Sequence, residues 1–512
     1  MTLGNGQLRS KSGYLPTEVL STIFQECLEL DELDCTTPDP HQAPLVLTWV
    51  CRLWRSIALN THRLWAGVMF IREASRVDGS TRLLELWMER SGALPFGVRL
   101  ANIMREGEPV LSLTGRLEES SPQTDGLKTF IDTLLKCRKR WRVLEIVLPE
   151  ISLAAPLLQA ITQDTQVLEH VCISLQYLGL NEEPSIYDFS RNKSLKSVRL
   201  ITPLVLPLPS GNEIFTNLTM LELHFCASIQ DVLTWIDMAP NLTLLLVRFF
   251  MTGARRVPHP SARRVRRLPF LTSFELTCFA ANPDADDPGL LLDMLELPEL
   301  IELEIELSHL FDSPDWPHVK NLLVRSEASL LSLSISGTPM SDRDVVECLR
   351  LSPDLESFEC EIMMDEILRA LTPRLISESE ETGSDSSFAP TSEERIATDS
   401  TTDGKSIDND QITNNLDSAS EDASKFTVMC PNLEFLETSD VDGCSLQVLY
   451  EMMSSRCDEI YQDIQGYVDT SSVRPTPQEF KTLQSIVLPC DPLYSTLSHP
   501  LILEGLERIV YF

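Results

Sequence analysis

The sequence predicts an α/β solenoid preceded by a small all-α helical module. Three observations lead to this fold class: an apolar motif that recurs at a nearly constant interval, helix signals between successive motifs, and a tryptophan-rich helical segment near the N-terminus. The chain of 512 residues is long enough for several folding units or for one long repeat array. Its composition, 43% hydrophobic and 23% charged, is typical of a globular protein.

The recurring motif is L-x-x-φ-x-φ, where φ is an apolar residue, and we find twelve units. Alternation at its last two positions is the pattern of a strand with one buried face. The leading positions are Trp141, Leu168, Leu195, Leu218, Leu242, Leu271, Leu300, Leu330, Leu355, Leu433, Leu483 and Leu506. Most intervals are 23 to 30 residues, and the interval of 78 after Leu355 becomes 30 once the 48 polar residues 377–424 are subtracted. The array therefore continues beyond that insert.

Helix signals separate the motifs. Ser228 and Ser341 each precede an apolar pattern with a 3.6-residue period and can cap the helix that follows. Pro240, Pro298 and Pro353 stand just before the next motif, where proline ends a helix. One strand and one helix in about 25 residues is the leucine-rich-repeat unit, which buries its apolar side by stacking on its neighbours. An α/β domain of alternating strands and helices is the alternative, but such sheets rarely keep one period for so long.

The N-terminal segment carries two further helix signals. Pro16 suits the first turn of a helix and Glu18 suits its positive end, before an apolar face of Leu15, Val19, Leu20, Ile23 and Phe24. An acidic loop at 29–43 separates this helix from a second helical region that runs from Pro44 toward Trp65. A helical piece this small exposes several large apolar side chains unless a partner covers them.

These residues resemble the F-box. Leu15-Pro16-x-Glu18-Val19-Leu20-x-x-Ile23-Phe24 is similar to the opening LPxEvLxxIF of that family, and Val50-Cys51-Arg52-x-Trp54-Arg55-x-Ile57-Ala58 is similar to its vCrxWrxia segment. Leu64-Trp65 resembles the closing LW, and residues 86–96 resemble the linker of fungal F-box proteins with leucine-rich repeats.

The resemblance implies a non-catalytic role. F-box proteins dock on a Skp-type adaptor, which joins them to a cullin scaffold in an SCF-type cullin–RING E3 ubiquitin ligase, while the repeats hold the protein substrate. The implied adaptor-docking contacts, in a helix-in-groove mode, are Leu15, Pro16, Ile23, Phe24, Val50, Cys51 and Trp54. We expect Leu20, Leu53 and Ile57 to belong to the core of the module. The alternative function is a repeat-based protein-interaction scaffold that acts outside a ubiquitin ligase.

Charge and motif content exclude other function classes. The net charge of −34 repels nucleic acid and anionic lipid, and no run approaches about 18 apolar residues, so the expected partners are proteins. The nucleotide-binding, zinc-protease and hydrolase motifs are missing, so we expect no catalytic residue and no cofactor, and an enzyme on a repeat scaffold is the least favoured alternative. His224 lies in a predicted strand, where we expect a surface side chain.

The thirteen cysteines form no CxxC pair. Paired close spacings are typical of metal sites, and a disulfide framework is typical of small secreted domains. We therefore expect no metal site and reduced cysteines that act as small core residues. Together with an N-terminal segment that lacks the apolar region of a signal peptide, this predicts a cytoplasmic or nuclear protein.

One basic cluster interrupts this acidic chain. It contains six arginines, namely Arg255, Arg256, Arg263, Arg264, Arg266 and Arg267. Guanidinium groups bind phosphate and carboxylate groups bidentately, so the cluster is a candidate contact for a phosphorylated or acidic substrate. A nuclear-import signal and a solvated loop are the other interpretations.

The polar insert is strongly acidic, with 13 Asp and Glu against Arg395 and Lys405 between residues 377 and 424. Such a segment cannot bury enough apolar surface to fold, and its serines in acidic contexts suit phosphorylation, with an inert insertion as the alternative. The predicted organisation is a flexible tail (1–12), an F-box-like module (13–70), a linker with a first irregular repeat (71–130), leucine-rich repeats (131–375), an acidic Ser-rich disordered insert (376–425) and final repeats (426–512).

Overall fold

A computed structural model describes most of the N-terminal helical region and of the repeat region predicted at 131–375, together with parts of the region predicted at 426–512. The described residues are 15–30, 33–72, 77–102, 122–149, 151–175, 185–187, 189, 192–202, 205–207, 215–226, 228–251, 264–280, 287–308, 316–375, 426–427, 429–440, 444–456, 483, 485–488 and 510–511. The predicted tail at 1–12 and the acidic insert at 376–425 lie outside these residues.

The chain is an α/β protein built on one parallel sheet of fourteen strands. In spatial order these are β1 (Gly67–Arg72), β2 (Phe96–Asn102), β3 (Trp141–Leu148), β4 (His170–Leu175), β6 (Ser197–Ile201), β8 (Met220–Cys226), β9 (Leu244–Met251), β11 (Ser273–Ala280), β13 (Glu302–Leu307), β14 (Ser332–Ser336), β15 (Ser357–Ile362), β18 (Phe435–Asp440), β19 (Ser485–Leu488) and β20 (Val510–Tyr511). Three two-stranded sheets join β5 (Ser185–Tyr187) to β7 (Val205–Pro207), β10 (Arg266–Arg267) to β12 (Leu295–Glu296), and β16 (Arg374–Leu375) to β17 (Phe426–Thr427).

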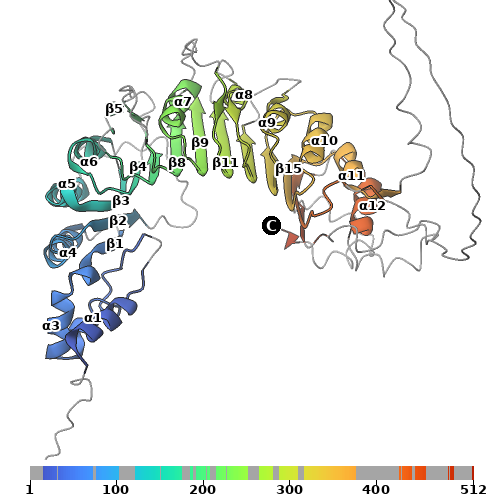
Figure 1. Cartoon of the computed structure of the whole chain (residues 1–512). Helices are drawn as coiled ribbons and strands as arrows, with labels where there is room; N and C mark the ends of the chain where they lie inside the picture. The colour runs from blue at the N-terminus through green and yellow to red at the C-terminus, as the bar shows by residue number, and fades with distance from the viewer. Residues whose placement is uncertain are drawn as a thin grey trace, which may run out of the picture.

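Helices lie on one side of this sheet. After the N-terminal helices come α4 (Val77–Arg90), α5 (Pro122–Leu135), α6 (Ile151–Asp164), α7 (Ile229–Met238), α8 (Gly289–Asp293), α9 (His318–Ser326), α10 (Asp342–Leu351), α11 (Asp365–Leu371) and α12 (Leu446–Arg456). Figure 1 shows an arch in which the helices line the outer side and the strands line the inner side. The inner face of the sheet carries no helix within the described part of the chain.

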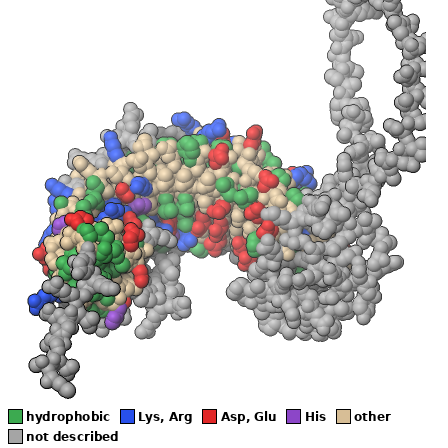
Figure 2. All heavy atoms as spheres, turned by 60° about the horizontal axis from the view of Figure 1, so that its bottom comes forward, with side chains coloured by type: hydrophobic (Ala, Val, Ile, Leu, Met, Phe, Trp, Pro, Cys, Tyr) green, Lys and Arg blue, Asp and Glu red, His purple; other side chains and the backbone are tan. Residues whose placement is uncertain are grey.

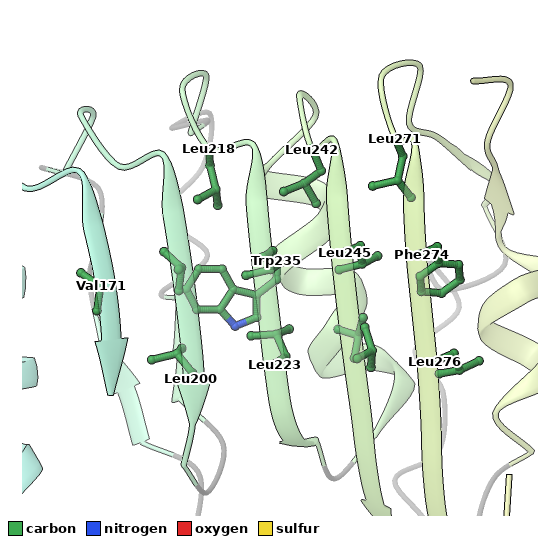
Figure 3. Packing of buried hydrophobic residues seen from close by; sticks show 14 of the residues in the cluster. Val171, Leu200, Leu218, Leu223, Trp235, Leu242, Leu245, Leu271, Phe274 and Leu276 are labelled. Carbon is green, nitrogen blue, oxygen red and sulfur yellow. The ribbon is translucent and has the colours of Figure 1, made fainter. Parts of the chain in front are cut away.

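The register of the sheet follows the sequence motif. Leu221, the φ position of one unit, pairs with Val198 on β6 and with Leu245 on β9, and the same relationship continues through Phe274, Leu303 and further units to Ile486. These side chains form buried rows into which Trp235 of α7 packs (Figure 3). The predicted alternation of strands with buried apolar positions is confirmed.

The predicted helix caps are also confirmed. The Ser228 Oγ accepts a hydrogen bond of 3.4 Å from the backbone N–H of Asp231 at the start of α7. At the start of α10, the Ser341 Oγ accepts one of 3.2 Å from the N–H of Asp344. Both serine hydroxyls donate in return to the aspartate carboxylates, so each cap satisfies a free backbone donor and holds a buried acid.

The N-terminal helices are continuous with the sheet. They are α1 (Thr17–Glu26), α2 (Leu47–Val50), α3 (Arg52–Asn60) and the 3-10 turn η2 (His62–Trp65), and β1 follows directly. Their buried side chains belong to the same core cluster as those of the strands. The boundary predicted at residue 70 falls inside β1, and the motif alignment missed both β1 and β2.

A short segment covers the open edge of β1. Thr36 forms a single parallel bridge with Val68, and the backbone N–H of Met69 donates to the Thr36 carbonyl at 2.9 Å. Gly67 allows this approach, because a Cβ there would lie 2.5 Å from the Asp34 carbonyl oxygen. The segment therefore satisfies part of a strand edge that would otherwise lie open.

Most of the described cysteines are buried core residues, as predicted. Cys226, Cys278, Cys348, Cys360 and Cys430 are buried and none is disulfide-bonded. Burial raises the pKa of the Cys278 and Cys348 thiols to about 12, so these groups stay protonated. They pack as small apolar side chains rather than as nucleophiles.

Candidate interaction surfaces

The N-terminal helices expose an unusual number of large apolar side chains. α1 turns Leu20 and Phe24 into the core while Val19 and Ile23 face outward. We call this surface the N-terminal apolar face, and its residues are Leu15, Val19, Ile23, Trp49, Val50 and Leu53. Figure 2 shows hydrophobic side chains gathered over this part of the molecule. Apolar groups gathered in this way are typical of a protein-binding surface.

Five of the seven residues expected to dock are exposed on the surface, and four of them are apolar. Leu15 is 46% exposed, Ile23 41% and Val50 56%, and Pro16 is exposed beside Leu15. Cys51 is exposed too, but its Sγ accepts a hydrogen bond of 3.4 Å from the N–H of Trp54 and so caps α3. Leu53, which we assigned to the core, is 42% exposed, so that assignment is wrong, whereas Leu20 and Ile57 are buried as predicted.

Phe24 is a correction to the expected docking set. Its side chain is fully buried, with its ring centroid 4.8 Å from that of the half-buried Trp54. A helix of ten residues has two sides, and the sequence alone did not show which apolar positions face inward. Phe24 and Trp54 therefore support the N-terminal apolar face from beneath.

A pair of tryptophans fixes this face relative to the sheet. Trp65 and Trp87 are fully buried and meet edge to face with ring centroids 5.0 Å apart. The Trp65 Nε1 donates to the Ala58 carbonyl at 2.9 Å, and the Arg90 guanidinium lies 4.3 Å from the Trp65 ring centroid. These contacts join α3, η2 and α4 into one packed unit, so the apolar face is held at a defined position at the end of the arch.

Ion pairs cover the first half of the inner sheet face. Arg99 on β2 pairs with Glu145 on β3 at 2.7 Å, and Arg248 on β9 pairs with Glu275 on β11 at 2.9 Å. Between them, Glu222 accepts from Arg199 and from His224, the latter at 2.7 Å. Each pair joins neighbouring positions of the sheet, so the charges of this half are balanced.

His224 corrects a second expectation. We predicted a surface side chain, but His224 is only 9% exposed and its ring bonds to the Glu222 carboxylate. Although burial alone raises the pKa of Glu222, its contacts with His224 and Arg199 lower it below the ordinary value. Glu222 therefore stays ionised and completes the balanced half of the face.

The second half of the inner face is acidic and unbalanced. Six carboxylates project from three strands, and we call them the acidic sheet face: Glu302, Glu304, Glu306, Glu359, Glu361 and Glu437. Figure 2 shows Asp and Glu side chains gathered along this side of the arch. Burial and the neighbouring carboxylates raise the pKa of Glu304 and of Glu437, which indicates mutual repulsion.

The basic cluster is only partly described, because Arg255, Arg256 and Arg263 lie outside the described residues. Arg264 is exposed. Arg266 pairs with Asp237 at 2.8 Å and its side chain is only 9% exposed, while Arg267 pairs with Glu296 at 3.0 Å. Arg266 is thus used to hold β10 against α7, and the expectation that it contacts a substrate is wrong.

A cavity of about 810 Å³ lies between α10 and α11 on the outer side of the arch. Arginines line it, but Arg350 pairs with Glu347 and Arg369 pairs with Asp365. Thr372 and Cys430 line the same cavity at the two points where the chain leaves for the acidic insert and returns from it. The cavity therefore marks the base of the insert.

Comparison with known proteins gives no assignment: no protein-family model matches the chain, and no curated protein matches it. Among the described residues, no helix is both long and apolar enough to cross a bilayer. The same part of the chain contains no group of three or more His, Cys, Asp or Glu side chains placed to hold a metal ion. The described residues thus form two candidate interaction surfaces, one apolar on the N-terminal helices and one acidic on the sheet.

Proposed function

We propose that this chain is the substrate-recognition subunit of an SCF-type cullin–RING ubiquitin ligase. In this proposal the N-terminal helices are an F-box that docks on a Skp-type adaptor, and the sheet is a leucine-rich-repeat array that binds the protein substrate. The observation that carries the proposal is the N-terminal apolar face. It exposes Leu15, Ile23 and Val50 at positions that resemble the F-box motif.

The geometry of α1 supports docking by helix-in-groove contacts. The inward side chains of α1, Leu20 and Phe24, are the ones that pack in the core. The outward Val19 and Ile23 are therefore not needed for folding. Burying an exposed Leu, Ile or Val against a partner contributes about 1.5–3 kcal/mol each. The free energy gained by burying four or five such groups exceeds the free-energy cost of association, which is enough for a stable complex.

The repeat assignment is supported by period and register together. Each unit supplies one strand to the sheet, and its second motif position pairs with the same position of the next unit. Buried rows of this kind are what stacked repeats produce. The receptor then has no chemistry of its own, and its task is to hold a substrate at a fixed place relative to the adaptor.

Adaptor binding can be tested with the purified full chain and a purified Skp-type adaptor in isothermal titration calorimetry. Replacing Leu15 and Pro16 with Ala, or Ile23 with Ala, should weaken binding by roughly tenfold or more. Val324→Ala on α9 is the matched control, because Val324 is 57% exposed and lies far from the N-terminal helices. Its binding should equal that of the wild type.

A scaffold that acts outside a ligase predicts a different result. In that case the adaptor would not bind, or would bind the Leu15 and Pro16 variant as tightly as the wild type. Affinity purification from cells under proteasome inhibition would then recover partners of the sheet face without adaptor or cullin. Either result would overturn the ligase proposal and leave the repeat surface as the functional part.

A further inference from the structure

The two halves of the inner sheet face differ in charge balance. Arg99, Arg199 and Arg248 each meet a glutamate on a neighbouring strand, so the half from β2 to β11 is neutralised within the fold. Beyond β11, Glu302 and Glu306 make no hydrogen bond or ion pair within the described part of the chain. Within the described part of the chain, the carboxylates of this face without a cationic partner therefore include those of β13.

The register places like charges side by side. Glu304 on β13 pairs in register with Glu275 on β11, and Glu359 on β15 pairs with Glu437 on β18. Ser334 of β14 stands between the two pairs and donates to Glu359 at 2.8 Å. Like charges directly opposite one another destabilise a sheet, so the fold keeps these carboxylates at a cost. A cation bound across them would remove that cost.

Two exposed phenylalanines lie on the same face as these carboxylates. Phe279 follows Glu275 and Thr277 on the free side of β11 and is 44% exposed, and Phe435 precedes Glu437 on β18 and is 45% exposed. Both rings are open to solvent, and Phe279 lies on β11, the neighbour of β13, whereas Phe435 lies three strands from β13. Exposed aromatic rings beside carboxylates can bind lysine and arginine side chains. The apolar stem packs against the ring, and the cationic end pairs with the carboxylate.

We propose that the acidic sheet face binds an extended lysine- or arginine-rich segment of a protein, laid along β13 with Phe279 of the neighbouring β11 beside it. This inference rests on the proposed function, because it names the chemistry of the substrate that the repeats hold. Every second residue of β13 is a glutamate, namely Glu302, Glu304 and Glu306, so each carboxylate lies about 6.6 Å from the next along the strand. An extended peptide presents every second side chain at the same spacing, so basic residues at alternate positions match the three carboxylates.

The probe is a fluorescein-labelled peptide in which lysine alternates with serine over seven residues, titrated with the full chain and followed by fluorescence anisotropy. We expect saturable binding that weakens as salt rises from about 0.05 to 0.3 M. Glu304→Gln with Glu306→Gln should weaken binding by roughly tenfold. Phe279→Ala on the neighbouring β11 should weaken it by roughly threefold, which a purely electrostatic attraction would not produce.

The matched control is Glu85→Gln with Glu89→Gln, which removes the same charge from exposed positions on α4. If this control weakened binding as much as the β13 variant, only net charge would matter and the inference would be overturned. It would be overturned equally if the β13 variant bound like the wild type. Because both β13 glutamates are exposed and repel their neighbours, their replacement should leave the melting temperature unchanged or higher, so misfolding does not explain a loss.

The remaining outcomes separate this inference from the proposed function. If the peptide does not bind while the Skp-type adaptor does, the basic substrate class is wrong and the ligase proposal stands. If the peptide binds and the adaptor does not, the surface is right and the ligase proposal fails. If sedimentation instead shows that the wild-type chain self-associates and that the β13 variant is monomeric, a second copy of the chain occupies this face and the inference is overturned.

Discussion

Arg456 donates from Nη1 to the carbonyl oxygen of Cys430 at 3.2 Å. The arginine comes from the last turn of α12 and is fully buried, and Cys430 lies where the chain returns from the acidic insert. Its Nε and Nη2 donate to the carbonyls of Leu371 and Met429 at 2.7 and 2.6 Å. One side chain thus ties together the two points between which 50 or so residues, 376–425, are inserted.

We therefore predict that Arg456→Met destabilises the C-terminal part of the array. Methionine preserves most of the volume but leaves buried carbonyls without donors, at a cost of about 1–3 kcal/mol. Urea unfolding measures the loss, and hydrogen exchange should locate it at α11, α12 and β18. Arg350→Met is the control, because its ion pair with Glu347 is exposed and should contribute less than about 0.5 kcal/mol. Equal stability of the two variants would contradict the prediction.

Phe24 and Ile23 are neighbours in sequence with opposite roles. Phe24→Ala empties a buried site and should cost about 3–5 kcal/mol in unfolding free energy. Ile23→Ala removes an exposed side chain and should cost less than about 1 kcal/mol while weakening adaptor binding. Chemical denaturation and calorimetry of the same two variants check both parts. A stable Phe24→Ala protein would mean that α1 is not packed as described.

His318 gives the fold a dependence on pH. Burial alone would lower the pKa of this imidazole, but contacts with Asp287 at 3.4 Å and Asp293 at 3.0 Å outweigh burial and raise it. The resulting stabilisation is complete below the unfolded pKa of about 6.5 and is lost as pH rises through the folded value. Melting temperatures measured from acid to alkaline pH should therefore fall across this window, and His318→Gln should flatten the fall. An unchanged slope in that variant would reject the assignment.

The charged form of Glu304 destabilises the fold, whereas the charged form of His318 stabilises it. Burial, Glu275, Glu359 and Glu306 together raise its pKa, so the folded state binds the proton more tightly than the unfolded state does. Ionised Glu304 therefore destabilises the fold at neutral pH, and this penalty disappears as pH falls through its pKa. Glu304→Gln should raise the melting temperature at pH 7 by an amount equivalent to less than about 1 kcal/mol, because water screens the repulsion. A gain that persists unchanged at acid pH would contradict the electrostatic cause.

The strands of the fourteen-stranded sheet from β3 onward could be predicted from the sequence because most of them place two apolar side chains at a spacing of two. The strands of the three two-stranded sheets were not predicted. Leu144, Val198 and Leu245 are buried at the expected positions. β2 was missed because Pro95 stands at the leading position of the L-x-x-φ-x-φ template. β1 fits the template at Trp65, Val68 and Phe70, but Trp65 was assigned to the N-terminal module instead. Their own alternation, Val68 with Phe70 and Val98 with Leu100, was visible in the sequence and would have identified them.

The interaction surfaces were harder to predict because they depend on neighbours far apart in the chain. Whether Phe24 or Ile23 faces the core is decided by Trp54, which lies thirty residues further on. The glutamates of β13 are plain in the sequence, but the position of Glu304 next to Glu275 and two strands from Glu359 follows only from the register of four repeats. His224 was misplaced for the same reason, since its partner network includes Arg199 of the preceding unit.

The bridge between Thr36 and Val68 has a consequence for the size of the molecule. A parallel array of identical units has no intrinsic limit, because the last strand offers the next one the same backbone donors and acceptors that it used itself. Residues 34–36 occupy part of the edge of β1 and so reduce the backbone that another chain could pair with there. A protein shortened past Thr36 would expose more of this edge, and association of chains through β1 would become more favourable.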